Sequence, residues 1–443
     1  MSSIPDFTIK TLGECKLASP LEEGRGESKE FVSDDEKLLY ESRVTRFGEY
    51  GGNIGNVPTM EIAGPRRKIY FDPSKTRAAI VTCGGLCPGL NNVIRGLTLG
   101  LHHLYGVRKI YGFQYGYEGF IASHKHDVVQ LTPDFVDGIH EIGGTILASS
   151  RGEQDTSAIV DCLDRMDINM LFTIGGDGTL RGATDIAEEI ARRGMNISII
   201  GIPKTIDNDI AYTEMSFGFQ TAYAEAVAAI RSAHTEAKGA PNGVGLVRLM
   251  GRLSGFIACF ATLAMPDVNF VLIPEMPFDM EGPGGFLEAL KHRLDRRGHA
   301  VVVVAEGAGQ DILARATKES SRKTDASGNI RLKDIGIYLR DTVPPWFKDR
   351  DIPINLKYID PSYIIRSVPA SPIDSVFCGQ LARNAVHAAM TGRTEMIVGF
   401  WKNLFVHVPI PTAISTRKMV DPDSALWRGV LETTGQGKLV NEK

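Results

Sequence analysis

From Arg77 onward, short runs of apolar residues alternate with amphipathic segments. The apolar runs are rich in β-branched residues, as buried strands are, and the segments between them repeat apolar residues at helical spacing. The expected strands are residues 77–83, 169–174, 197–202, 244–250, 270–275 and 300–306. The expected helices are residues 91–105, 184–194, 222–239 and 285–298. This alternation predicts an α/β fold with parallel sheets covered on both faces.

Residues 1–75 follow a different pattern. They are rich in Glu, Ser, Gly and Lys, and Asp34–Val44 is the one short helix that we expect there. We interpret this stretch as an N-terminal extension that packs on the main body without a core of its own. Because 443 residues exceed one ordinary core, we expect the rest of the chain to form two Rossmann-like domains.

Composition and charge narrow the class of protein. Apolar residues make up 43% of the chain, and 49 Lys and Arg oppose 53 Asp and Glu, for a formal charge of −4. A balanced chain of this kind has no general attraction for nucleic acid or anionic membranes. The six cysteines form no CxxC pair, so we expect buried thiols in a reducing compartment. No signal-peptide pattern and no membrane-spanning apolar run is visible, which predicts a cytoplasmic protein without membrane or nucleic-acid partners.

Glycine-rich loops follow the first two expected strands: GGLCPGLNN at 84–92 and GGDGTLRGA at 175–183. Glycine lets the backbone approach a ligand, and the next helix offers free N–H groups to phosphate. Neither loop is a GxxxxGK[ST] P-loop, so an ordinary P-loop nucleotide hydrolase is disfavoured. Asp177 stands where a cation bridging phosphates would need a carboxylate, although an acid there can also cap the helix.

The third expected strand leads into PKTIDNDI at 203–210. In an extended segment, Thr205, Asp207 and Asp209 would project from the same side, with Lys204 as a neighbouring cation. One hydroxyl and two acids beside a phosphate loop are suited to deprotonating an attacking alcohol. Taken alone, IDND is more often a turn that caps a helix.

Two further polar residues follow later strands. Arg252, in VRLMGRLSGF, suits a phosphate contact, although arginines of this kind more often form surface ion pairs. Glu306 ends the run AVVVVAE and could accept hydrogen bonds from sugar hydroxyls, or simply be a solvated strand end. Both lie where ligands bind in open α/β sheets, at the carboxyl ends of strands.

Seven segments together resemble the phosphofructokinase family, in that family's order. They are GGLCPGLNN, SSRGEQD, GGDGTLRGA, PKTIDNDI, LMGRLSGF, AEGAGQ and KYIDPSYIIR. The resemblance covers about residues 76–416. GGDGT by itself also occurs in NAD kinases and lipid kinases, whereas PKTIDND does not. The chain is similar to the longer subgroup of the family, which includes both ATP-using and pyrophosphate-using enzymes.

The resemblance implies transfer of the γ-phosphoryl group of ATP to the 1-hydroxyl of fructose 6-phosphate, with Mg²⁺ as cofactor. Residues 76–218, completed by about 364–416, would bind nucleotide and Mg²⁺. Residues 219–363, completed by about 417–443, would bind fructose 6-phosphate. The family's shared active sites imply a homo-oligomer, with a tetramer expected.

The resemblance also assigns individual residues. Those expected around the ATP phosphates are Gly85, Arg151, Gly152, Gly176, Asp177, Gly178 and Thr179, and Asp177 would hold Mg²⁺. The expected catalytic residues are Asp207 as general base, Arg252, Asp209, Thr205 and Lys204. The expected sugar-phosphate residues are Thr205, Ile206, Asp207, Met250, Gly251, Arg252, Glu306, Lys357, Tyr363, Ile364, Ile365 and Arg366. Tyr363 and Arg366 would contact the 6-phosphate, and Lys357 would reach it from a neighbouring subunit.

The chain departs from the short bacterial enzymes of the family at this phosphate clamp. Those enzymes have His where Tyr363 stands and Arg where Lys357 stands. They have a further Arg where Gly243 stands here. The clamp for the 6-phosphate is therefore partly rebuilt, and the residue that compensates is open.

The donor is predicted from Gly178 and Lys204. Pyrophosphate users carry Asp in place of Gly178, and its side chain and charge would occupy the space of the ATP α-phosphate. Lys204 is typical of pyrophosphate users, but a cation there serves either donor. We therefore expect ATP, with a pyrophosphate-dependent phosphofructokinase as the alternative.

Two other classes fit the sequence less well. An NAD or lipid kinase would leave Asp207, Asp209 and the Tyr363/Arg366 pair without a purpose. A regulatory paralogue that binds sugar phosphate without turnover would be expected to lack Asp177 or Asp207, and both acids are present.

Overall fold

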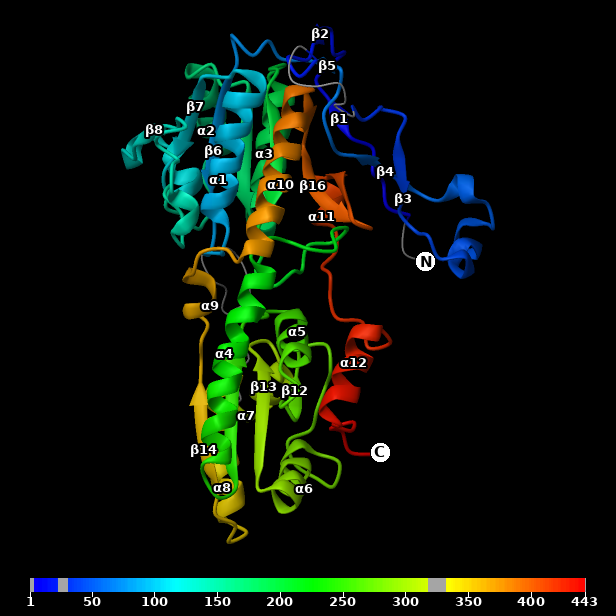
Figure 1. Cartoon of the computed structure of the whole chain (residues 1–443), viewed down its shortest axis with the longest axis vertical. Coiled ribbons are helices and arrows are strands. Elements are labelled where there is room, and N and C mark those ends of the chain that lie inside the picture. The colour runs from blue at the N-terminus through cyan, green and yellow to red at the C-terminus, as the bar shows by residue number, and fades with distance from the viewer. Residues whose placement is uncertain (1–3, 23–30, 318–331, 443) are drawn as a thin grey trace. The chain divides into compact units, whose positions relative to one another are not determined.

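The computed structural model describes residues 4–22, 31–317 and 332–442 (Figure 1). The chain divides into two compact units. Unit 1 consists of Met1–Thr205, Ile210–Gly218 and Val368–Arg417. Unit 2 consists of Ile206–Asp209, Phe219–Ser367 and Lys418–Lys443. Small parts of the expected extension and of the expected sugar domain, residues 1–3, 23–30, 318–331 and 443, lie outside the described residues. The assignment of nucleotide and sugar binding to separate domains stays a prediction.

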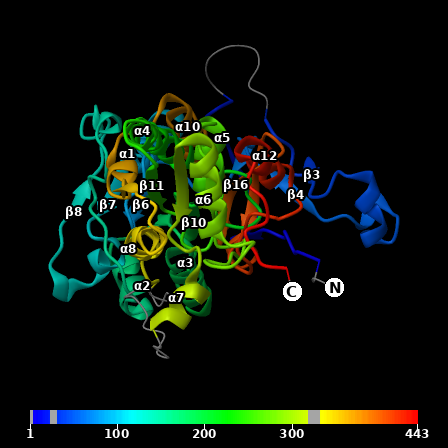
Figure 2. The ribbon, with the colours of Figure 1, turned by 90° about the horizontal axis from the view of Figure 1, so that it is seen from below.

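Unit 1 is built on a nine-stranded sheet with the order β3-β4-β17-β16-β10-β9-β6-β7-β8. Its strands are β3 (Lys37–Leu39), β4 (Thr59–Ile62), β6 (Arg77–Thr82), β7 (Lys109–Phe113), β8 (Val128–Gln130), β9 (Met170–Gly175), β10 (Ser198–Pro203), β16 (Met396–Trp401) and β17 (Leu404–Pro409). The run from β16 to β7 is parallel, as predicted, but β8 at one edge and β17, β4 and β3 at the other are antiparallel. Figure 2 shows β8, β7, β6, β10, β16, β4 and β3 in this order across the view. Two short antiparallel pairs join β1 (Lys10–Thr11) to β15 (Arg393–Thr394) and β2 (Leu17–Ala18) to β5 (Lys68–Ile69).

Helices cover both faces of this sheet. They are α1 (Leu90–Leu99), which continues as a π-helical turn over Gly100–Tyr105, α2 (Thr156–Arg165), α3 (Asp177–Arg192), α10 (Pro372–Met390) and α11 (Ile410–Ala413). The 3₁₀ helices of unit 1 are Val44–Tyr50, Ile54–Asn56, Gly116–Phe120, Ala122–His124 and Ile139–Glu141.

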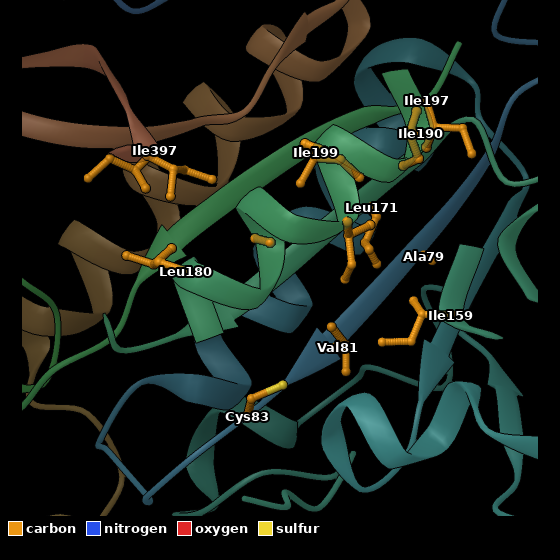
Figure 3. Close-up of a cluster of buried hydrophobic side chains, with 14 of the residues drawn as sticks. Ala79, Val81, Cys83, Ile159, Leu171, Leu180, Ile190, Ile197, Ile199 and Ile397 are labelled. Atoms are coloured by element: carbon orange, nitrogen blue, oxygen red, sulfur yellow. The ribbon is translucent and has the colours of Figure 1, made fainter. Parts of the chain in front are cut away.

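The core of unit 1 follows the alternation of its strands. Val81, Leu171 and Ile199, from three neighbouring strands, pack with Leu180 of α3 and Ile159 of α2 (Figure 3). The intervening strand residues point to the opposite face, where α10 contacts β10 and β16. On that face α1 and α10 touch closely, because a Cβ at Gly96 would lie 2.7 Å from the Cβ of Ala382.

Unit 2 contains a four-stranded sheet in which every pair is parallel, with the order β12-β13-β11-β14. Its strands are β11 (Gly243–Leu249), β12 (Phe270–Leu272), β13 (His299–Ala305) and β14 (Asn355–Ile359). Its helices are α4 (Phe219–Lys238), α5 (Phe256–Ala264), α6 (Phe286–Arg297), α7 (Gln310–Thr317), α8 (Ile335–Lys348), α9 (Ile364–Ser367) and α12 (Ala425–Thr434). Side chains from α6 and α8 form one core cluster with β11 and β13, while α4 and α5 contact the sheet as well.

The predicted helix at Asp34–Val44 is wrong. Its middle forms β3, in which Leu38 pairs with Met60 of β4, and a 3₁₀ helix begins only at Val44. Tertiary contacts override the helical pattern. The Tyr40 ring stacks on Trp401 at 5.3 Å, and the Trp401 Nε1–H donates to the Tyr40 carbonyl at 3.0 Å.

The N-terminal extension is held to the rest of unit 1 by an ionic cluster around two buried arginines, Arg66 and Arg393. The Arg393 guanidinium donates to Asp34 at 2.8 Å and to Glu61 at 2.9 Å, and Arg66 donates to the same Asp34 oxygen. Glu61 also lies 3.2 Å from Nδ1 of His407. The extension therefore adds β3 and β4 to the sheet and belongs to unit 1.

No helix in the described stretches combines the length and the apolarity that a membrane crossing requires.

Candidate active site

The loop after β6 brings together Gly85 and Arg151, two of the residues expected at the donor site. Gly84 has φ +83°, a conformation that favours glycine, and its N–H donates to the Ser150 carbonyl at 3.0 Å. A Cβ at Gly85 would lie 3.2 Å from Nη2 of Arg151. Gly152 follows with φ +112°. The SSRG segment thus packs along the first glycine loop and presents an exposed guanidinium beside it.

Lys204 joins the two glycine loops at the carboxyl ends of β6, β9 and β10. Its ammonium group donates to the Gly85 carbonyl at 2.6 Å, and its backbone N–H donates to the Gly175 carbonyl at 2.9 Å. A Cβ at Gly176 would lie 3.4 Å from the Lys204 carbonyl oxygen. The Lys204 residue is only 7% exposed, so its charge is fixed where the loops meet.

Asp177 opens α3, with Gly176 as its N-cap. Its Oδ2 lies 2.7 Å from Nη2 of Arg417, and both side chains are about a quarter exposed. Sequence reasoning missed Arg417. The partner lies far along the chain in a segment without a recognised motif, so no local signal could have found it.

The first turn of α3 also carries Gly178 and Thr179. Thr179 is buried, and its carbonyl accepts a hydrogen bond from the Tyr117 hydroxyl at 2.8 Å. Gly178 is exposed, and a Cβ there would meet no atom of the described residues within 4 Å. The backbone therefore leaves open space at the position expected to select the donor.

Asp177 has the chemistry of a Mg²⁺ ligand. It offers a partly exposed carboxylate at the start of a helix, and Mg²⁺ in phosphotransferases is bound by one or two carboxylates together with substrate phosphates. The free N–H groups of the same helix terminus suit the phosphates. The Asp177 carboxylate beside the second glycine loop therefore fits the cofactor predicted from the sequence.

The segment from Lys204 to Ile210 is not extended, contrary to expectation. Residues Ile206 and Asp207 form a turn, and Asn208 has φ +54°, which reverses the backbone direction. Lys204 and Thr205 belong to unit 1, whereas Asp207 and Asp209 belong to unit 2. Period-two alternation therefore does not place Thr205, Asp207 and Asp209 on one side, and their joint action stays a prediction.

Within unit 2, Asp207 is held by the turn after β11. The Arg252 backbone N–H donates to Oδ2 of Asp207 at 3.3 Å, and the Ser254 hydroxyl donates to the Asp207 carbonyl at 3.1 Å. Gly251 has φ +124°, and a Cβ there would lie 2.4 Å from the Ser254 carbonyl oxygen. The structure thus brings together Asp207, Gly251 and Arg252, three of the predicted residues.

Glu306, at the end of β13, is paired with Arg248 and is not a freely solvated strand end. Arg248 Nη2 lies 2.9 Å from Glu306 Oε2, and Nη1 lies 2.7 Å from Asp360 Oδ2. Burial raises the pKa of Glu306, and Arg248 and Arg252 oppose that shift. Sequence reasoning missed Arg248, although a charged residue within an otherwise apolar parallel strand was a usable signal.

The expected 6-phosphate residues lie on β14 and α9. Lys357 is exposed on β14, which is an edge strand, and Tyr363 is 76% exposed. The Arg366 guanidinium lies 4.6 Å from the centroid of the Tyr363 ring. Ile364 is also exposed, but Ile365 is fully buried, so its side chain belongs to the packing of unit 2.

Gly243 cannot carry the arginine that short bacterial enzymes have there. It opens β11, and a Cβ at this position would lie 2.0 Å from the Ala237 carbonyl oxygen. The backbone of α4 occupies the space that a side chain would need. The packing of unit 2 therefore excludes a long side chain at this position.

Comparison with known proteins supports the family resemblance that the motifs suggested. The family model for phosphofructokinase matches residues 77–389. The chain belongs to the phosphofructokinase family. It is 50% identical to an ATP-dependent 6-phosphofructokinase of Borreliella burgdorferi over 97% of each chain. It is 48% identical to an ATP-dependent 6-phosphofructokinase of Amycolatopsis methanolica, over 98% of this chain and 95% of that one.

Solved phosphofructokinase structures share the fold. A pyrophosphate-dependent phosphofructokinase from Marinobacter aquaeolei superposes with a TM-score of 0.66 at 20% identity, covering 82% of this chain and 92% of that one. The predicted α/β fold is therefore confirmed at the level of the family.

Proposed function

We propose that the chain transfers the γ-phosphoryl group of ATP to the 1-hydroxyl of fructose 6-phosphate. The observation that carries the proposal is the junction at Lys204, where a buried ammonium ties together two glycine loops of a phosphofructokinase-family chain. The relatives that are 50% and 48% identical to this chain, both named ATP-dependent 6-phosphofructokinase, support the same reaction.

Unit 1 would bind the donor. The N-terminus of α3 presents N–H groups to the phosphates, and Arg151 and Lys204 add positive charge on either side of Gly85. Phosphoryl transfer depends mainly on positioning and on neutralising charge, so rigid cations around glycine backbone are well suited to it. Gly152, Gly176 and Thr179 would complete the phosphate contacts.

Asp177 would hold Mg²⁺, which neutralises charge on the donor phosphates when it is bound. The Arg417 guanidinium occupies one oxygen of this carboxylate. In the proposal, Arg417 turns from Asp177 towards the phosphates when Mg·ATP binds, so that Asp177 exchanges one cation for another. This exchange would keep the carboxylate neutralised in both states.

Unit 2 would bind the acceptor. Asp207 would take the proton of the 1-hydroxyl as the new bond forms, and the Arg252 N–H fixes the orientation of its carboxylate. The Arg252 guanidinium would stabilise charge on the transferring group. Thr205 and Asp209 would support the base, and Ile206, Met250 and Gly251 would line the sugar.

The remaining sugar contacts would come from Glu306 and the β14–α9 segment. Arg248 fixes the Glu306 carboxylate in one orientation, which is what an acceptor for sugar hydroxyls needs. Tyr363 and Arg366 would bind the 6-phosphate, together with the backbone around Ile364 and Ile365. Lys357 would reach this phosphate from a neighbouring subunit of a homo-oligomer, for which we propose a tetramer.

The donor assignment is tested by comparing ATP and pyrophosphate in a coupled assay of fructose 1,6-bisphosphate formation. We expect ATP activity far above pyrophosphate activity, because the space at Gly178 is open and exposed. An enzyme that prefers pyrophosphate would overturn the donor and leave the acceptor reaction in place. Absence of turnover with both donors would overturn the proposed function.

A further inference from the structure

A cluster of three potential metal ligands lies in unit 1, outside the residues assigned above. Glu118, His124 and His126 each offer a ligand atom, and these atoms lie within 4.8 Å of one another. Oε2 of Glu118 and Nε2 of His126 are 3.6 Å apart. All three residues lie in the connection between β7 and β8.

The backbone of this connection brings the two imidazoles to one side. Glu118 lies in the 3₁₀ helix Gly116–Phe120, and His124 ends the next one, Ala122–His124. Lys125 then adopts φ +56°, a left-handed conformation that turns the chain between the two histidines. As a result the His124 and His126 rings are parallel within 7°, with centroids 5.8 Å apart.

Neighbouring groups also fix the position of the His126 ring. The Tyr115 ring stacks on it at 4.5 Å, and the Gln114 N–H donates to the Asp127 carbonyl at 3.4 Å, which closes the connection at its base. Metal-binding histidines need ring orientations fixed by neighbouring groups. This stacking fixes the His126 ring without blocking its Nε2, which faces Glu118.

We propose that Glu118, His124 and His126 bind a divalent transition-metal ion of the Zn²⁺ class. Two imidazoles and one carboxylate are ligands for Zn²⁺, Co²⁺ or Ni²⁺, whereas Mg²⁺ and Ca²⁺ prefer all-oxygen sites. With bonds of about 2.0–2.2 Å, the ligand atoms must approach to about 3.4 Å. The side chains of Glu118 and His126 are 27% and 24% exposed and His124 is exposed, so small rotations can achieve this.

The bound ion would cross-link the two short 3₁₀ helices to the turn before β8. Three protein ligands leave a fourth position for water, so the ion would stay exchangeable. The site is separate from Asp177 in its ligands and in the metal that it selects. It does not depend on the proposed donor or acceptor.

The first experiment is a titration of the chelator-treated full chain with Co²⁺ at about pH 8, where imidazole is neutral. Millimolar Mg²⁺ is present to fill oxygen-only sites. We expect one Co²⁺ per chain, visible absorption typical of nitrogen and oxygen ligands, no thiolate band, and displacement by Zn²⁺. Absence of binding, or a thiolate band, would overturn the proposal.

Variants locate the site. Glu118→Gln, His124→Gln and His126→Gln should each weaken Co²⁺ binding by more than the ~10–100-fold that loss of an outer-shell partner costs. The matched control is the double variant His102→Gln/His103→Gln, which removes the half-buried His102 and the exposed His103, whose Nδ1 atoms are 3.4 Å apart. The control should bind Co²⁺ like the unmodified chain. Loss of binding in the control alone would contradict the assignment.

Trypsin gives a readout that depends on neither spectra nor activity. Lys125 lies between the two histidines, so a bound ion should slow cleavage after Lys125 at least severalfold. Cleavage after the exposed Lys75 serves as an internal control for any effect of the metal on trypsin. Equal cleavage after Lys125 with and without saturating Zn²⁺ would show that the ion binds elsewhere.

Discussion

Lys204 in unit 1 and Lys357 in unit 2 are both expected to meet phosphate, but their surroundings are opposite. Lys204 is 7% exposed, and its ammonium donates to the Gly85 carbonyl inside its own unit. Lys357 stands exposed on the edge strand β14. Lys204 is thus positioned by its own chain, whereas Lys357 is presented outward. This contrast favours a donor site complete within one chain and a sugar site that a second subunit completes.

The acids differ in the same way. Asp177 forms an ion pair with Arg417, and both side chains are about a quarter exposed. Glu306 shares Arg248 with Asp360 and Asp334, and the Arg248 side chain is only 14% exposed. We therefore expect Asp177 to exchange its partner more easily than Glu306. The predictions below test this contrast, beginning with the largest expected effect.

Asp207→Asn should lower kcat by about 10²–10⁴-fold, the usual share of a general base. The amide oxygen can still accept the Arg252 N–H, so substrate affinity should change much less. Steady-state kinetics with ATP and fructose 6-phosphate measure both effects. Near-full turnover by this variant would remove Asp207 from the mechanism.

Gly178→Asp should reduce ATP use by several hundred-fold. A carboxylate about 4 Å from the α-phosphate costs on the order of 4 kcal/mol at an effective dielectric near 20. A Cβ at this position meets no described atom within 4 Å, so the fold should tolerate the change. Gly178→Asn is the matched neutral control and should retain most of the ATP activity. Equal losses in both variants would point to size and not to charge.

Arg248→Met should destabilise unit 2 by about 3 kcal/mol, because it leaves partly buried carboxylates without their cation. It should also raise the KM for fructose 6-phosphate, since Glu306 loses its fixed orientation. Urea unfolding and kinetics measure the two effects. Arg248→Lys keeps the charge, so its stability and its KM should lie between those of the unmodified chain and those of Arg248→Met. An unchanged unfolding midpoint in Arg248→Met would show that the network contributes nothing to stability.

Lys357→Ala should raise the KM for fructose 6-phosphate by about 10–100-fold, the effect of losing one charged hydrogen bond. Stability should hardly change, since the side chain is exposed. Mixing Lys357→Ala with Asp207→Asn chains should restore some activity, because hybrid oligomers contain sites with both intact halves. Confirmed subunit exchange without recovery would place Lys357 in its own chain's site.

Acidification should destabilise unit 1. Burial lowers the pKa of His387 to about 3 and that of His407 to about 4. Unfolded histidine titrates near 6.5, so the unfolded state binds more protons below that pH, and stability falls as the pH drops from about 6.5 towards 4. His387→Gln should flatten this slope in a series of melting temperatures, whereas the exposed His292→Gln should leave it unchanged. An unaltered slope in His387→Gln would exclude this histidine as its cause.

The main strands and helices were predictable because each carries its own periodic pattern. The antiparallel edge at β3 and β4 was not, since these strands are short and become strands only by pairing, β3 with β4 and β4 with β17. The glycine loops and the Asp207 segment were found by motif. Their geometry could not be predicted. Asn208 adopts a left-handed conformation, so the segment turns where alternation suggested an extended strand. Arg417 escaped prediction because its partner Asp177 is distant in the sequence.

The pairing of β10 with β16 has a consequence for synthesis on the ribosome. Ile200 pairs with Met396, so one edge of the central strand β10 lacks its neighbour until roughly 200 further residues have been made. At ~5–20 residues per second, this delay is on the order of 10–40 s. During that time unit 2 can form in large part, while unit 1 keeps an apolar strand edge available for wrong partners. Synthesis of unit 1 begins first, but its sheet is completed late. The nascent chain is therefore most vulnerable to aggregation in unit 1.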